Sequence, residues 1–314
     1  MVCHRWKLIF ALQTFLVFGA AGYKIDQSCA QEGIENDVRN AMTSAFEMVD
    51  SALARLTASP LQQTTVDVLG KLFAGPGQDP RTAVTARTVD VFAQIRDNYR
   101  NEVPVDQPVG EDDLIIFCNR DHYQLIDKNK DIWLDKANDV FFHSKEAMCG
   151  NSMKDKLFLA ETSNPLRETD RKYKLGKDAI STLIGKTVVN LSGKAPFGFV
   201  QIDAFALLDK VLLHEMTHGR SAYVTRDENG EVEDEGLIGA KTSRGWLGLG
   251  LLKATTYGWS KCASLAKRDD RLGGINAADN NADTLALFGS ICKVMDDRNS
   301  PRTVDDKGRI IPLA

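Results

Sequence analysis

The sequence predicts an α+β fold in which a largely helical first part precedes short strands. Apolar residues recur at helical spacing from Gln31 to Leu56 and again from Thr82 to Tyr99, with a Gly- and Pro-rich break between the two runs. Short apolar runs at 113–118 and 131–134 are typical of strands, and we expect residues 121–130 to turn between them. These observations favour one mixed domain.

The first 22 residues resemble a secretory signal peptide. Basic residues near the start precede an apolar run from Leu8 to Ala21, and the small residues 20–22 offer a cleavage site before Tyr23. The run is short for a membrane span, although an uncleaved anchor is the alternative. We therefore expect a secreted, extracellular protein that has no membrane contact once this segment is removed.

Secretion would place the cysteines in an oxidising environment, where they are expected to form disulfides. None of the five that follow the leader has the Cys-x-x-Cys spacing of a zinc–thiolate site. The favoured pairs are Cys118 with Cys149 and Cys262 with Cys292, which would leave Cys29 free. Sequence alone does not decide between this and other connectivities.

The segment 207–220, LLDKVLLHEMTHGR, carries the strongest chemical signal. Its pattern predicts a helix, and residues four apart lie on one face of a helix, so His214 and His218 can bind one metal ion. Glu215 lies beside them, where a carboxylate can accept a proton from metal-bound water. This HExxH spacing is the zinc-peptidase signature.

The same spacing also arises by chance on unrelated helices, with solvated side chains. Here the context favours a site, because the helix is apolar on several sides and a buried imidazole needs a partner that a metal ion can supply. The apolar residues are Val211, Leu212, Leu213 and Met216. By contrast, His122 and His143 lie far away in sequence and are expected to be ordinary packed or surface histidines.

Two later stretches contain carboxylates that could reach this site. The segment 226–235 is strongly acidic and is expected to be a solvated loop, or else to bring one of its carboxylates to the metal. Asp283 precedes an apolar helix predicted at 285–295, where it could cap the helix or point into a cleft.

From Phe205 to Cys292 the chain resembles the aspzincin metallopeptidases, which comprise the fungal deuterolysins and the lysine-specific metallo-endopeptidases. The resemblance rests on three motifs in order: HEMTH at 214–218, Tyr257-Gly258 followed by a cysteine, and Asn281-Ala282-Asp283 before a Leu- and Phe-rich helix. It implies a zincin-like fold, with a cleft between the HExxH helix and the region 257–283.

The resemblance also implies a role for each matching residue. His214 and His218 match the two zinc-binding histidines, and Glu215 matches the general base. Tyr257 matches a tyrosine that donates a hydrogen bond to the oxyanion of the tetrahedral intermediate, with a packed aromatic as the alternative reading. The family's third zinc ligand is an aspartate three residues before that tyrosine, and Ala254 occupies this position here.

Asp283 matches an aspartate that binds the substrate lysine in the lysine-specific members. Ala286 replaces the glutamate that accompanies it, so only one of the two carboxylates is present. Asp283 is therefore expected either to favour basic residues after the scissile bond or to act as a substitute zinc ligand. An acid from the stretch Glu231 to Glu235 is the other substitute.

Taken together, these motifs imply a secreted, monomeric, Zn²⁺-dependent metalloendopeptidase that hydrolyses proteins or peptides through a metal-activated water. The alternative is a catalytically degenerate scaffold that serves as a secreted binding protein or effector, because Ala254 supplies no ligand. A nucleic acid partner is not expected, since the net charge is −4 and no basic, aromatic-interleaved patch is visible.

The expected organisation follows from the motifs. Residues 1–22 form the signal peptide, and residues 23–298 form one domain with a helical portion at 23–102 and a sheet and catalytic portion at 103–298. Residues 299–314 are polar and contain two prolines, so a loosely held tail is expected.

Overall fold

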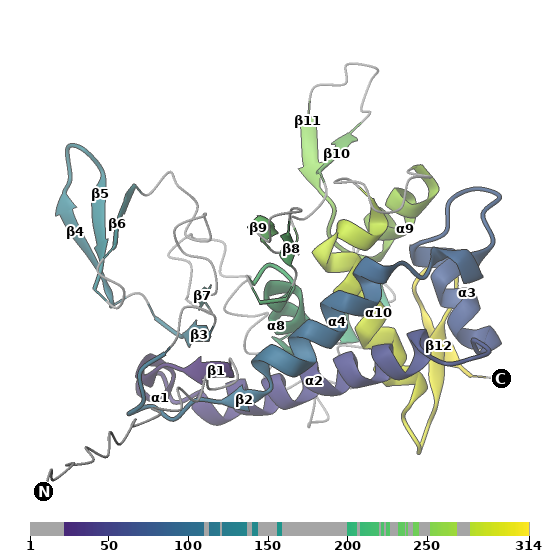
Figure 1. Ribbon diagram of the computed structural model, residues 1–314, viewed down its shortest axis with the longest axis horizontal. Helices are drawn as coiled ribbons and strands as arrows, with labels where there is room; N and C mark the ends of the chain where they lie inside the picture. Colours follow the sequence, from purple (N-terminus) through teal and green to yellow (C-terminus); the bar gives the residue numbers. More distant parts are fainter. Residues whose placement is uncertain are drawn as a thin grey trace, which may run out of the picture.

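The computed structural model is an α+β protein that is mostly helical, with small parallel and antiparallel sheets (Figure 1). No helix in the portion of the chain that it describes is long and apolar enough to cross a membrane. The described residues are 22–109, 113–119, 121–136, 140–143, 156–158, 200–205, 208–219, 221–222, 224–226, 232–235, 237, 241–244, 252–268 and 277–313.

Helix α2 (Glu35–Leu56) is the centre of the helical part. It packs against α4 (Ala86–Tyr99), α8 (Leu208–Met216) and α10 (Ala282–Met295). Its buried apolar side chains recur at helical spacing, which explains why it can contact several helices at once. The predictions of helices within 31–56, 82–99 and 285–295 are confirmed.

The other helices within the described residues are short, and α3 was not predicted. They are α1 (Gln27–Gln31), α3 (Gln63–Leu72), α7 (Gln201–Phe205) and α9 (Trp259–Arg268), with 3₁₀ turns η1 (Pro80–Ala83) and η4 (Ala278–Asn280).

A four-stranded sheet lies beside the start of α2 (Figure 1). Its order is β2-β1-β3-β7, and each neighbouring pair is parallel. The strand predicted at 113–118 is β3, whose four residues are all buried. The bounds are β1 (Gly22–Ile25), β2 (Asn101–Glu102), β3 (Leu114–Phe117) and β7 (Lys156–Phe158).

A separate three-stranded antiparallel sheet projects from the helical body (Figure 1). The strand predicted at 131–134 is its central strand. The expected turn at 121–130 was predicted too long, because it contains β4 (Tyr123–Asp127), which pairs with β5 (Ile132–Asp135). The strands are β4 (Tyr123–Asp127), β5 (Ile132–Asp135) and β6 (Val140–His143).

The described part of the chain also contains three antiparallel hairpins, and two of them follow the HExxH region in sequence. They are β8 (Val224–Arg226) with β9 (Val232–Glu235), β10 (Lys241–Arg244) with β11 (Leu252–Thr255), and β12 (Arg302–Val304) with β13 (Ile310–Pro312).

The last hairpin corrects the expectation of a loosely held tail. Strands β12 and β13 pair through three residues each, and β12 packs against α10. Val304 is completely buried, and the indole nitrogen of Trp259 donates a hydrogen bond to the carbonyl of Asp306 at 3.2 Å. The polar composition of the segment concealed these few anchoring contacts.

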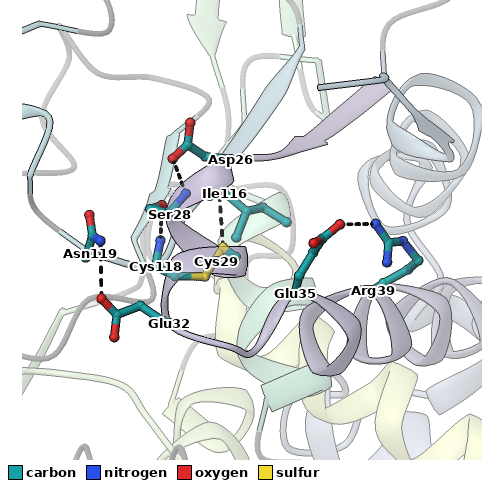
Figure 2. The surroundings of a disulfide bond; sticks show 9 residues. All are labelled: Asp26, Ser28, Cys29, Glu32, Glu35, Arg39, Ile116, Cys118 and Asn119. Carbon is teal, nitrogen blue, oxygen red and sulfur yellow. Dashed lines mark hydrogen bonds and ion pairs between the residues drawn. A yellow bond between two sulfur atoms is a disulfide. The ribbon is translucent and has the colours of Figure 1, made fainter. Parts of the chain in front are cut away.

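The expected disulfide pairs are wrong where the structure describes them. Cys29 is bonded to Cys118, with Cα atoms 4.7 Å apart, so Cys29 is not free and Cys118 does not pair with Cys149 (Figure 2). Strands β1 and β3 are parallel neighbours; Cys118 directly follows β3, and Cys29 lies in α1, the short helix after β1. Cys262 and Cys292 are buried free thiols, and Cys149 lies outside the described residues.

Candidate metal site

Helix α8 carries the HExxH motif and packs against α2 and α10. Leu212, Leu213 and Met216 are completely buried, as expected, but Val211 is 45% exposed, so one side of the helix faces solvent. The helix ends at Met216, earlier than predicted, and His218 lies in the turn that follows.

The turn after α8 still brings the two histidines together. The amide of His218 donates to the carbonyl of Glu215 at 3.0 Å, a tighter closure than the bond to residue 214 that an α-helix would make. The Nε2 atoms of His214 and His218 lie 3.3 Å apart. Both side chains are thus presented to one common point.

The opposite nitrogen of each ring contacts an oxygen atom. Nδ1 of His214 lies 3.3 Å from Oδ1 of Asp283, and Nδ1 of His218 makes a short contact with the carbonyl oxygen of Leu237. A carbonyl oxygen and an ionised carboxylate can only accept hydrogen bonds. Each Nδ1 therefore carries a proton, and in the neutral ring the lone pair is on Nε2.

This arrangement fits a zinc ion. Burial lowers the pKa of His218 to about 3, so its ring is neutral and its Nε2 is a lone-pair donor. Two facing lone pairs require a cation between them, either a proton or a metal ion. Nitrogens held at about 2.0–2.1 Å from one tetrahedral zinc are about 3.3–3.4 Å apart, which is the separation of these two atoms.

Glu215 and Tyr257 lie at the same site. Glu215 is half-buried, and burial raises the pKa of its carboxyl group, with a smaller opposing effect from His214. A raised pKa makes its carboxylate a stronger base. The ring of Tyr257 is 5.3 Å from the ring of His214, and 52% of Tyr257 is exposed. Tyr257 is thus not enclosed in the core, as a purely packed aromatic would be.

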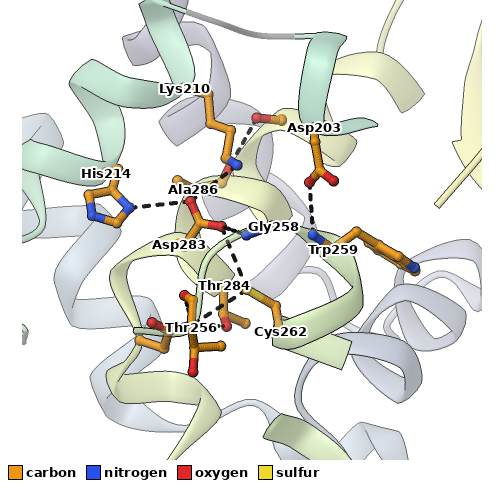
Figure 3. A network of polar contacts seen from close by, with 12 residues as sticks. Asp203, Lys210, His214, Thr256, Gly258, Trp259, Cys262, Asp283, Thr284 and Ala286 are labelled. Atoms are coloured by element: carbon orange, nitrogen blue, oxygen red, sulfur yellow. Dashed lines mark hydrogen bonds and ion pairs between the residues drawn. The ribbon is translucent and has the colours of Figure 1, made fainter. Parts of the chain in front are cut away.

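Asp283 belongs to a buried polar network at the start of α10 (Figure 3). Its Oδ1 lies 3.1 Å from the ammonium of Lys210, and its Oδ2 accepts a hydrogen bond from the amide of Gly258 at 2.5 Å. Gly258 has a φ of 81°, a conformation that suits glycine, and it forms the turn between Tyr257 and α9.

Asp203 contributes a second carboxylate to this network. It accepts hydrogen bonds from the amides of Trp259 at 2.8 Å and Val200 at 3.1 Å, so it fixes the start of α9. Burial raises the pKa of Asp203, and Lys210 partly offsets this effect. Asp203 and Asp283 thus both hold the turn after Tyr257 through its backbone amides.

A third ligand does not emerge from the described residues. They contain no group of three His, Cys, Asp or Glu side chains that could hold a metal ion. Ala254 lies in β11 opposite Thr242 and supplies no ligand atom. Within the acidic segment, Glu235 ends strand β9, while residues 227–231 lie outside the description.

Leu237 nevertheless connects the acidic segment to the site. Its amide donates to the carbonyl of Thr217 at 2.9 Å, and its carbonyl contacts Nδ1 of His218. Two residues of chain span at most about 7 Å, so the backbone of Glu235 lies close to the motif.

Sequence reasoning missed Lys210, Asp203 and the carbonyl of Leu237. Lys210 did leave a signal: it precedes His214 by one turn in an apolar helix, and a buried ammonium requires an anionic partner. His122 and His143 contact their own part of the fold, as expected. His122 stacks on Phe117 at 4.1 Å, and His143 contacts the carbonyl of Lys130 at 3.1 Å.

No protein-family model matches the chain, and neither the curated proteins nor the solved structures include a significant match. The likeness to the aspzincins therefore rests on the ordered motifs from His214 to Asp283, and the chemistry of the site rests on the geometry of its own residues.

Proposed function

We propose that the protein is a secreted, zinc-dependent metalloendopeptidase of aspzincin type, with a zincin-like arrangement around α8. The observation that carries the proposal is the 3.3 Å separation of the Nε2 atoms of His214 and His218, each with its Nδ1 proton bound to an oxygen. In this proposal residues 1–22 are a signal peptide, and the secreted chain acts as a monomer on proteins or peptides.

His214 and His218 would hold the zinc through Nε2. When bound, zinc polarises a carbonyl group and lowers the pKa of a water to about 7. Glu215 accepts the proton of the attacking water, a role that suits a half-buried carboxylate whose pKa burial has raised. It can then pass that proton to the leaving amine.

Tyr257 donates a hydrogen bond from its hydroxyl to the oxyanion that forms at the scissile carbonyl. Its exposure and its position beside the ring of His214 support this role. Removal of one such donor typically costs about 10²–10³ in rate, so Tyr257→Phe is expected to lower kcat with little change in KM.

The experiment begins with the metal content of the purified secreted protein after dialysis. About one zinc per chain is expected, together with cleavage of unfolded protein that a chelator abolishes and added zinc restores. Glu215→Gln should retain the zinc and lose the cleavage. A Glu215→Gln variant that cleaves as fast as the wild type contradicts the mechanism.

The second candidate is a degenerate aspzincin scaffold that binds a partner without hydrolysis. The alanine at position 254 favours it, since a catalytic zinc normally has three protein ligands. This candidate predicts a folded protein that retains no zinc after dialysis and has no chelator-sensitive cleavage. Metal content therefore separates the two functions before any substrate is known.

A further inference from the structure

Asp283 contacts both halves of the candidate metal site. Its Oδ1 lies 3.3 Å from Nδ1 of His214, while its Oδ2 accepts the amide hydrogen of Gly258, the residue after Tyr257. Its side chain is only 6% exposed. One buried carboxylate thus joins the first histidine to the turn that carries the exposed tyrosine (Figure 3).

Lys210 balances the charge of this carboxylate. It precedes His214 by one helical turn, and its ammonium lies 3.1 Å from Oδ1 of Asp283. Burial raises the pKa of Asp283, but Lys210, His214 and Gly258 outweigh burial and lower it overall. Burial likewise lowers the pKa of Lys210, and its carboxylate neighbours raise it overall. Their direct contact allows both groups to be charged inside the protein.

The position of Asp283 excludes it from the point where the two histidines converge. It contacts Nδ1 of His214, whereas His218 faces Nε2, on the other side of the ring. A carboxylate in this place orients an imidazole, fixes its tautomer and increases its basicity as a ligand.

We propose that Asp283 is the positioning residue of the site: it directs Nε2 of His214 toward His218 and fixes the turn of Tyr257 through Gly258, with Lys210 as its counter-ion. The inference rests on the proposed function for the identity of the metal. Loss of such a partner typically lowers metal affinity about 10–100-fold.

Asp283→Asn alone would leave the buried ammonium of Lys210 without this counter-charge, so it is expected to lose stability. The double variant Lys210→Met/Asp283→Asn removes both charges, and replacement of a buried ion pair by neutral groups is often close to neutral for stability. The double variant should unfold at higher urea than Asp283→Asn, and it should remain below the wild type because Asp203 also loses the charge of Lys210. Its zinc affinity, measured by competition with a chelator, should stay 10–100-fold below that of the wild type.

Asp203→Asn is the matched control, because Asp203 belongs to the same buried network but bonds Trp259 and Val200 instead of a histidine. It should lose stability and keep the zinc affinity of the wild type. A double variant that binds zinc as tightly as the wild type would show that Asp283 has only a structural role, and would overturn the inference.

A second readout needs no metal. In the metal-free wild type, ¹⁵N NMR of the imidazoles should show His214 with its proton on Nδ1, and the double variant should gain the Nε2–H tautomer. His218 is the internal control, since its Nδ1 contacts Leu237 in both proteins.

The two readouts separate the inference from the proposed function. A wild type that binds no zinc but shows the Nδ1–H tautomer of His214 rejects the peptidase and retains the positioning of the ring. A wild type in which Nδ1 of His214 carries no proton rejects the positioning, whether or not zinc is bound.

Discussion

The ammonium of Lys210 lies 3.1 Å from the carboxylate of Asp283, and both side chains are buried. The pair links α8 to α10 at the point where the HExxH histidine meets the Tyr257 turn. Two buried charges in contact satisfy each other, since either one alone would be costly in the protein interior. The pair also determines whether the carboxylate of Asp283 is available to bind a basic side chain of a substrate.

We predict that cleavage shows no preference for Lys or Arg after the scissile bond. The resemblance to lysine-specific enzymes implies such a preference through Asp283, but in this chain Lys210 already supplies an ammonium to that carboxylate. A substrate lysine would have to displace it from a side chain that is 6% exposed. A cleavage map of an unfolded protein, identified by mass spectrometry, checks this. Enrichment of basic residues at that position would contradict it.

We predict that the third zinc ligand comes from the acidic segment, with Glu235 as the first residue to test. Leu237, two residues after Glu235, contacts Thr217 and His218 through its backbone and so holds this part of the chain against the motif. Glu235→Gln should weaken zinc binding more than about 100-fold. A loss of about 100-fold is the most expected when the mutated residue only holds a zinc ligand in place.

Asp234→Asn is the control for this substitution, because it removes a neighbouring acid from the same strand. Equal zinc affinity in Glu235→Gln and the wild type would place the third ligand elsewhere or support a site with two histidines alone.

The helices were largely predictable because their buried residues recur at helical spacing, as in α2. α3 was missed, although its five buried residues also recur at helical spacing. The disulfide was mispredicted because the proximity of Cys29 and Cys118 comes from the parallel pairing of β1 with β3, a contact across 89 residues. Local pattern does not determine such long-range pairing.

The motif residues could be identified from sequence, whereas their partners could not. His214, Glu215 and His218 are fixed by spacing along one segment. Lys210 and the carbonyl of Leu237 become part of the site only through packing. A backbone carbonyl has no sequence signature at all, which is why the partner of His218 had to come from the structure.

We predict that Glu102 stabilises the fold in a pH-dependent way. Arg39 donates hydrogen bonds to both of its carboxylate oxygens, at 2.8–3.1 Å, and thereby joins α2 to β2. These bonds lower the pKa of Glu102, with burial as a smaller opposing effect. The stabilisation is therefore fully present above the unfolded-state pKa of about 4.3 and is lost as the pH falls through the lower folded-state value.

Glu102→Gln should accordingly unfold at lower urea than the wild type at pH 7, by about 0.5–1 kcal/mol, because the pair is partly exposed. The difference should shrink below about pH 4.3 and also in 1 M salt, which screens the pair. A difference that stays constant from pH 7 to pH 3 would show that charge is not its origin.

We predict that Gly308→Ala destabilises the protein more than Gly77→Ala does. Both glycines have positive φ values, 71° and 75°, so alanine brings similar backbone strain at each, about 1–2 kcal/mol. Their surroundings differ. A Cβ on Gly308 would lie 2.5 Å from a methyl carbon of Val200 and 2.6 Å from the indole of Trp259, while a Cβ on Gly77 meets nothing within 4 Å.

Overpacking of this kind typically adds about 1–3 kcal/mol, so Gly308→Ala should lower the free energy of unfolding by about 2–5 kcal/mol in total. Urea denaturation of the two variants beside the wild type measures the difference, and the common backbone strain cancels between them. The excess reports how tightly the last hairpin packs on Trp259, which begins α9 directly after the Tyr257-Gly258 turn. If the two variants lose the same free energy of unfolding, the hairpin shifts to accommodate the added methyl group at no energetic cost. It would then not support the site.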